Sequence, residues 1–122
     1  MPDETLIREA IQASVNAAEH ADASALSEQL SDDFTGDADT LDRQSLLNLL
    51  RVARLRGESI QIILGPVHIE ARGDRYVVTF TATLTSGWAL FPSDMGIYAV
   101  EAGWRRQDHH WVCYSASWHQ QL

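Results

Sequence analysis

Residues 103–118, GWRRQDHHWVCYSASW, contain the pattern that decides the fold of this chain. Aromatic and small apolar residues stand on both sides of the polar segment QDHH, which is typical of two β-strands joined by a tight turn. In a two-residue turn, Asp108 and His109 occupy the central positions, where positive φ favours glycine but is tolerated by Asp and His. The stretch therefore predicts a hairpin with two adjacent histidines at its tip.

The histidines and the lone cysteine of this hairpin can also be interpreted as a metal or nucleophilic site. Adjacent strand residues point to opposite faces, so His109 and His110 do not converge on one ion, and the sequence contains no spaced set of Cys and His ligands. Cys113 lies in an apolar strand, where a thiol is usually a small buried side chain. We expect no metal, no cofactor and no nucleophilic cysteine.

Upstream of the hairpin, the spacing of apolar residues changes near Gly57. Before it, apolar residues recur at steps of three and four, which predicts two short helices broken near Asp22 and a third helix over residues 42–57. The many leucines of this third helix predict that it is largely buried. After Gly57, alternating β-branched residues predict four strands, over residues 59–71, 75–85, 96–105 and 111–118.

Two turn signals refine the strand region. Gly73 and Asp74 suit a two-residue turn between the first two strands, and the Leu-Gly-Pro step at 64–66 predicts a bulge or bend because proline cannot donate to a central ladder. Helices followed by antiparallel strands predict an α+β domain in which the helices pack on one face of a curved sheet.

Composition limits the partners. The chain has 122 residues, 45% of them hydrophobic, which fits a single domain over residues 1–122. Nine basic against 17 acidic residues give a net charge of −8, which disfavours nucleic acid and anionic membranes. The chain start lacks a basic region before an apolar run, and no window is apolar enough to span a membrane. We therefore expect a soluble, cytoplasmic protein.

The order of helices and strands, the acidic segment LSDDFTGDAD at 30–39, the helix LDRQSLLNLL at 41–50 and the closing hairpin resemble the nuclear transport factor 2-like superfamily, in particular its SnoaL-like bacterial members. The similarity covers nearly the whole chain. It implies a cystatin-like α+β roll, in which a bent antiparallel sheet wraps around the N-terminal helices as a cone. It also implies a cavity at the open end and a homodimer through the outer face of the sheet.

A carboxylate near the second helix is the first candidate catalytic group. In isomerase-like members of the superfamily, a carboxylate just after that helix is the general base, and Asp37 lies near this place, although the Asp-Pro step of the isomerase pattern is absent here. The same acidic segment is also typical of a solvated loop with helix caps. Both interpretations stay open.

A second candidate is Glu101 in the closing hairpin. If the hairpin pairs without a bulge, Glu101 shares a face with Tyr114 and Trp118, and Tyr98 lies on the other face. Glu101 is then a possible desolvated acid, with Tyr98 or Tyr114 as hydrogen-bond donor to a developing oxyanion. Alternatively, Glu101 is an exposed carboxylate paired with Arg105. Because both faces carry aromatic residues, we expect one to line a cavity and the other to be covered by a second subunit.

Residues 86–96, SGWALFPSDMG, are unusually apolar for a loop, and Trp88 and Phe91 stand out. Such a loop is either a lid over an apolar ligand or a contact with a partner subunit.

Three classes of function stay open on this sequence, because the same cone hosts enzymes and non-catalytic proteins. The first is a protein that binds a small hydrophobic molecule in the cone. The second is an acid–base isomerase, dehydratase or cyclase of the ketosteroid isomerase type. The third is a non-catalytic module for dimeric assembly. The candidate ligand-pocket residues are Tyr98, Glu101, Tyr114, Trp118, Trp88 and Phe91.

Overall fold

A computed structural model describes residues 3–37, 40–85 and 95–121 of the chain. In these ranges the chain forms three helices and seven strands. The helices are α1 (Asp3–Glu19), α2 (Ala23–Ser27) and α3 (Arg43–Leu55). The strands are β1 (Leu30–Gly36), β2 (Leu41–Asp42), β3 (Gln61–Leu64), β4 (His68–Arg72), β5 (Arg75–Thr85), β6 (Met95–Gln107) and β7 (His110–Gln120).

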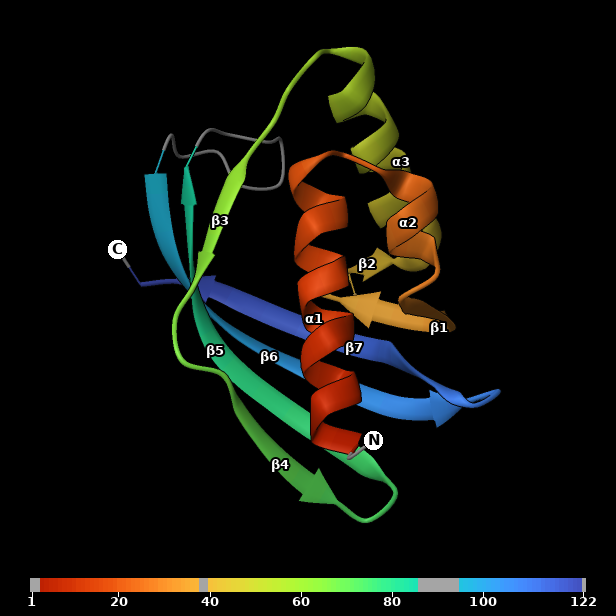
Figure 1. Cartoon of the computed structure of the whole chain (residues 1–122). Coiled ribbons are helices and arrows are strands. Elements are labelled where there is room, and N and C mark those ends of the chain that lie inside the picture. Colours follow the sequence, from red (N-terminus) through yellow and green to blue (C-terminus); the bar gives the residue numbers. More distant parts are fainter. Residues whose placement is uncertain (1–2, 38–39, 86–94, 122) are drawn as a thin grey trace.

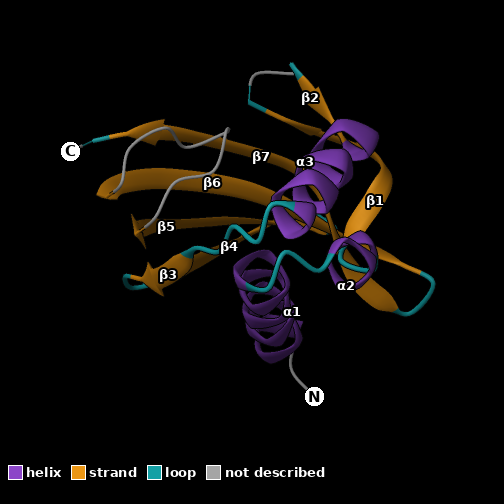
Figure 2. Cartoon of the chain, turned by 90° about the horizontal axis from the view of Figure 1, so that it is seen from above, coloured by secondary structure: helices purple, strands orange, loops and turns teal. Residues whose placement is uncertain are grey.

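The strands form one curved sheet with the order β2-β1-β7-β6-β5-β3, and β4 pairs with β5 beyond the end of β3. Every pair is antiparallel except β1 with β7, which is parallel. All three helices lie on one side of the sheet, which bends around α1 (Figures 1 and 2). We call the helix side the concave face and the other side the convex face. This arrangement confirms the predicted α+β fold with a curved sheet around N-terminal helices.

The helix ends follow the local sequence signals. Asp22 caps α2 by accepting a hydrogen bond from the Ala25 N–H at 3.0 Å, and Asp42 caps α3 in the same way. After α3, Gly57 has φ of +69°, and the Glu58 N–H donates to the Ala53 carbonyl at 2.9 Å. This is a Schellman ending, which favours glycine at the left-handed position. The predicted break near Asp22 and the predicted helix end at Gly57 are confirmed.

The prediction that α3 is largely buried is wrong. Leu47, Leu50 and Ala53 are buried, but 88% of Leu55 is exposed. A helix in the outer layer of a two-layer domain buries only the stripe that faces the sheet, so the remaining apolar residues stay at the surface.

The strand β1 formed within the acidic segment, and the short strand β2 formed after it, at the start of the stretch expected to be helical. β1 pairs with β2, which follows it closely, and with β7, which lies far along the chain and which no local pattern near β1 indicates. The bend predicted at 64–66 is present, because β3 ends at Leu64 and β4 begins at His68. The first predicted strand therefore becomes two, both paired with β5.

The turn at the tip of the closing hairpin has the predicted conformation. Asp108 and His109 have φ of 49° and 71°, and Gln107 pairs with His110. Positive φ at both central residues is the geometry that matches the twist of a two-residue hairpin. The two histidines therefore have a structural explanation. None of the helices that the structure describes is long and apolar enough to cross a membrane.

Candidate functional site

The concave face of the sheet and the helices line a partly open cavity of about 230 Å³. Aliphatic side chains from α1, α3, β3 and β5 form much of its wall. Five aromatic side chains also line it: Phe34, Phe80, Tyr98, Trp104 and Trp118. The cavity is the part of the described structure that best fits a ligand site, because such sites are usually concave and mostly apolar.

The part of the cavity wall that the structure describes carries no formal charge. No Asp, Glu, His, Lys or Arg is among the described residues that line it. The Ser14 hydroxyl already donates to the Ala10 carbonyl at 2.8 Å, and the Cys113 thiol donates to the Ser115 carbonyl at 3.2 Å. Burial raises the pKa of Cys113 to about 12, so the thiol stays neutral at physiological pH. The wall therefore suits a neutral apolar molecule.

One side chain of this wall, Trp104, brings a polar N–H group into the apolar interior. Trp104 is only 3% exposed, and its buried indole N–H has no hydrogen-bond partner among the described residues. A buried donor without a partner costs about 1–3 kcal/mol relative to a satisfied one. The ring nevertheless supplies a large apolar surface to the cavity.

A bulge in the closing hairpin decides which side chains reach the cavity. β6 and β7 pair in the predicted register as far as Trp104 with Cys113, but the next pair is Gly103 with Ser115. Tyr114 is the extra residue, so every later residue of β7 changes face. Trp118 thereby joins Tyr98 on the cavity wall. The prediction that Trp118 shares a face with Glu101 is wrong for this reason.

Gly103 is the signal that could have located this bulge. An isolated glycine in a strand pattern often marks a bulge or a close approach of another group. A Cβ on Gly103 would lie 2.6 Å from Cζ of Tyr114, so the tyrosine ring occupies the space that a side chain would need.

Glu101 and Tyr114 lie on the convex face and do not line the cone cavity. Glu101 is exposed, between Thr79 of β5 and Ser117 of β7. Tyr114 is half-buried, with the guanidinium carbons of Arg75 and Arg105 at 4.8 Å and 5.7 Å from its ring centroid. Both residues line a separate pocket of about 240 Å³ on the convex face. The expected ligand pocket combined Glu101 and Tyr114 with Tyr98, but in the structure Glu101 and Tyr114 lie in a different pocket from Tyr98.

Most of the acidic segment, residues 30–36, forms β1, and Asp37 lies in an exposed turn directly after this strand. Asp37 is exposed, has φ of 51° and accepts a hydrogen bond from the Thr40 hydroxyl through its carbonyl. Asp42 is a helix cap, as described above. Asp37 does not line the cavity, so it is not positioned to act there as the general base that the resemblance implied. Trp88 and Phe91 lie outside the described residues.

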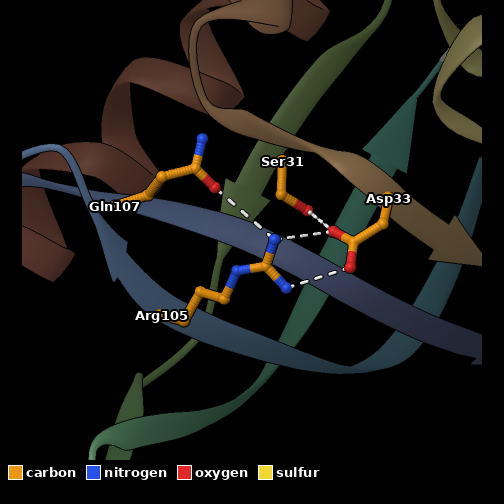
Figure 3. A network of polar contacts seen from close by, with 4 residues as sticks. All are labelled: Ser31, Asp33, Arg105 and Gln107. Atoms are coloured by element: carbon orange, nitrogen blue, oxygen red, sulfur yellow. Dashed lines mark hydrogen bonds and ion pairs between the residues drawn. The ribbon is translucent and has the colours of Figure 1, made fainter.

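An ion pair on the convex face was not expected from the sequence. Asp33 of β1 accepts two hydrogen bonds from Arg105 of β6, at 3.0 Å and 2.8 Å (Figure 3). Ser31 donates to the same carboxylate at 2.7 Å, and Arg105 also contacts Gln107. The hydrogen bonds from Arg105 and Ser31 lower the pKa of Asp33 to about 2. The pair joins residues far apart in sequence, so no local pattern predicts it.

The comparisons with known proteins concern the fold. No family model matches the sequence, and no curated protein matches it. Among solved structures, an NTF2-like protein from Cytophaga hutchinsonii is 15% identical, with a TM-score of 0.83 over 99% of this chain and 100% of the other. A candidate dehydratase of the NTF2-like family from Streptomyces avermitilis is 22% identical, with a TM-score of 0.78 over 98% and 97%.

A third similar structure is an NTF2-like protein with a cystatin-like fold from Novosphingobium aromaticivorans. It is 20% identical, with a TM-score of 0.77 over 95% of this chain and 80% of the other. The chain thus has the NTF2-like, cystatin-like fold, which confirms the resemblance seen in the sequence at the level of the fold. Because one fold hosts many activities, these similarities do not assign a reaction.

Proposed function

We propose that this protein binds a small, neutral and mainly apolar molecule in the cone. The observation that carries the proposal is the cavity of about 230 Å³, whose described wall is aromatic and aliphatic and carries no charge. An apolar cavity of roughly 150 Å³ stays dry and takes up benzene. A larger cavity of the same chemistry that is also open on one side accommodates a molecule of about two or three fused or linked rings.

Ligand binding is a better account of this site than acid–base catalysis of the ketosteroid isomerase type. That chemistry needs a carboxylate or histidine within reach of the substrate. Glu101 lies on the convex face and Asp37 in an exposed turn, and no other acid or histidine among the described residues lines the cavity.

A matched pair of fluorescent probes tests the proposal. N-phenyl-1-naphthylamine is neutral, and 1-anilinonaphthalene-8-sulfonate adds one sulfonate to the same ring system. We expect the neutral probe to bind saturably and the sulfonate to bind at least about tenfold more weakly, because burying an unpaired charge in an apolar site is costly. Equal affinity for the two probes, or no saturable binding of the neutral one, contradicts the proposal.

Two variants show whether the probe occupies the cone. Ala82 is 5% exposed and lines the cavity, whereas its neighbour Thr81 is exposed on the convex face. Ala82→Leu places added carbons in the cavity and should abolish or strongly weaken binding of N-phenyl-1-naphthylamine. Thr81→Leu adds an apolar side chain on the opposite face and should leave binding unchanged.

We also propose that the convex face joins two copies of the chain, as the sequence suggested. Ile63 is 64% exposed and points away from the cavity, since its neighbours Ile62 and Leu64 line it. The small side chain of Ala99 keeps this part of the convex face low, which lets a second sheet approach closely. Sedimentation equilibrium tests this proposal: Ala99→Arg should yield a monomer, and Gln44→Arg on the exposed side of α3 should not change the mass. The cytoplasmic location stays a prediction from the sequence.

A further inference from the structure

One part of the cavity wall lacks regular strand pairing. β1 pairs with β7 at Leu30 with Cys113 and again at Thr35 with Ser115. Between these points β1 advances by five residues and β7 by only two, so residues 31–34 arch away from the ladder. We call these four residues the β1 arch. Backbone hydrogen bonds hold the chain just outside the arch, from Cys113 N–H to the Gln29 carbonyl and from Asp37 N–H to the Ala116 carbonyl.

The β1 arch carries an aromatic residue of the cavity. Phe34 is 3% exposed and lines the cone. A Cβ on Gly36 would lie 3.3 Å from the end of the Phe34 ring and 3.3 Å from the Trp118 ring. The two rings therefore both lie next to Gly36 and form this side of the cavity wall.

The residue before Phe34 anchors the arch from the opposite face. Asp33 binds Arg105 through two hydrogen bonds, and β7 lies between their strands in the sheet (Figure 3). Arg105 is itself held by Gln107 and lies over the Tyr114 ring. Ser31, 1% exposed, donates to Asp33 from the start of the arch. Asp33 thus ties the arch to β6 in place of the missing ladder, and Ser31 supports the same carboxylate from the start of the arch.

We propose that the Asp33–Arg105 ion pair is a positioning element of the ligand cavity, which holds the β1 arch so that Phe34 closes the wall against Trp118. The inference rests on the proposed function, because it names what shapes the same site. Asp33 and Arg105 do not touch a ligand in the cone; their effect passes through Phe34. Bidentate Arg–carboxylate pairs fix orientation as well as distance, which suits this role.

A double-mutant cycle tests the proposal with N-phenyl-1-naphthylamine as the probe. Asp33→Asn keeps the shape of the side chain and removes its charge, and it should weaken probe binding by up to about fivefold, the effect typical of a good exposed ion pair. In the Phe34→Leu background, Asp33→Asn should have no further effect on binding, although it still lowers the free energy of unfolding. Asp33 and Phe34 would then be coupled in probe binding but not in the free energy of unfolding. A residue that only stabilises the fold is not expected to give this result.

Glu70→Gln is the matched control. Glu70 is an exposed carboxylate paired with Arg72 at 3.2 Å on β4, which does not pair with β1. Its substitution should leave probe binding unchanged. Unchanged binding in Asp33→Asn, or an equal loss in the wild-type and Phe34→Leu backgrounds, overturns the proposal while leaving ligand binding in the cone intact.

A readout without ligand keeps the two proposals separate. In the free protein, the nuclear Overhauser contact between the Phe34 and Trp118 rings should weaken in Asp33→Asn and persist in Glu70→Gln. If wild-type protein fails to bind the probe, the proposed function fails, but this ring contact still reports on the positioning role. A contact of full strength in Asp33→Asn refutes that role.

Discussion

Truncating two leucines of α3 separately tests whether the cavity is a real part of the folded protein. Leu47 is 2% exposed and packs in the core away from the cavity, whereas Leu50 is 0% exposed and lines it. The same substitution, Leu→Ala, therefore removes the same atoms from the same helix in two different surroundings. Only the amount of packing around each side chain differs.

The expected losses follow from this difference in packing. Leu→Ala in a fully packed core costs about 3–5 kcal/mol, because lost transfer free energy and the new cavity both contribute. Leu50 already borders empty space, so it loses fewer contacts, and we expect about 2–3 kcal/mol. A domain of this size has about 5–15 kcal/mol of stability, so both variants should fold.

Urea unfolding at 25 °C measures the two free energies, with m-values checked for equality among the variants. Saturating N-phenyl-1-naphthylamine should stabilise wild type and Leu47→Ala by equal amounts and Leu50→Ala by a different amount, because only Leu50 contacts the ligand space. A loss in Leu50→Ala as large as that in Leu47→Ala, with equal ligand effects, refutes the cavity as described.

Three further predictions concern titration, reactivity and the turn. The pKa of the Asp33 carboxyl falls to about 2 in the folded protein. Ionised Asp33 should therefore stabilise the protein fully above the unfolded pKa of about 3.9, and this stabilisation should be lost as the pH drops toward 2. Urea unfolding between pH 5 and pH 2 should show this decline in wild type and a smaller decline in Asp33→Asn. Cys113 should react very slowly with a disulfide reagent in native protein at pH 8 and quickly in urea, because burial keeps the thiol protonated and inaccessible; fast native reaction contradicts its burial. His109→Gly should stabilise the protein by about 0.5–1 kcal/mol, since glycine accepts the φ of 71° without strain. A lower melting temperature in this variant would contradict the turn geometry.

Local sequence determined the parts of this fold that depend on neighbouring residues. Asp22, Asp42 and Gly57 predicted helix boundaries because capping involves backbone groups only a few residues away. Asp108 and His109 predicted a tight turn for the same reason. The resemblance of the whole chain to a known superfamily then supplied the curved sheet and the cone.

Tertiary structure alone decided the site. One extra residue at Tyr114 reverses the face of every later residue of β7, so Trp118 joins Tyr98 in the cone while Glu101 stays outside. Strand alternation has a period of two, and a single bulge therefore exchanges inside and outside over the rest of a strand. The ion pair between Asp33 and Arg105 likewise depends on the register of β1, β7 and β6. The residues next to Asp33 or Arg105 in the sequence do not predict this pair.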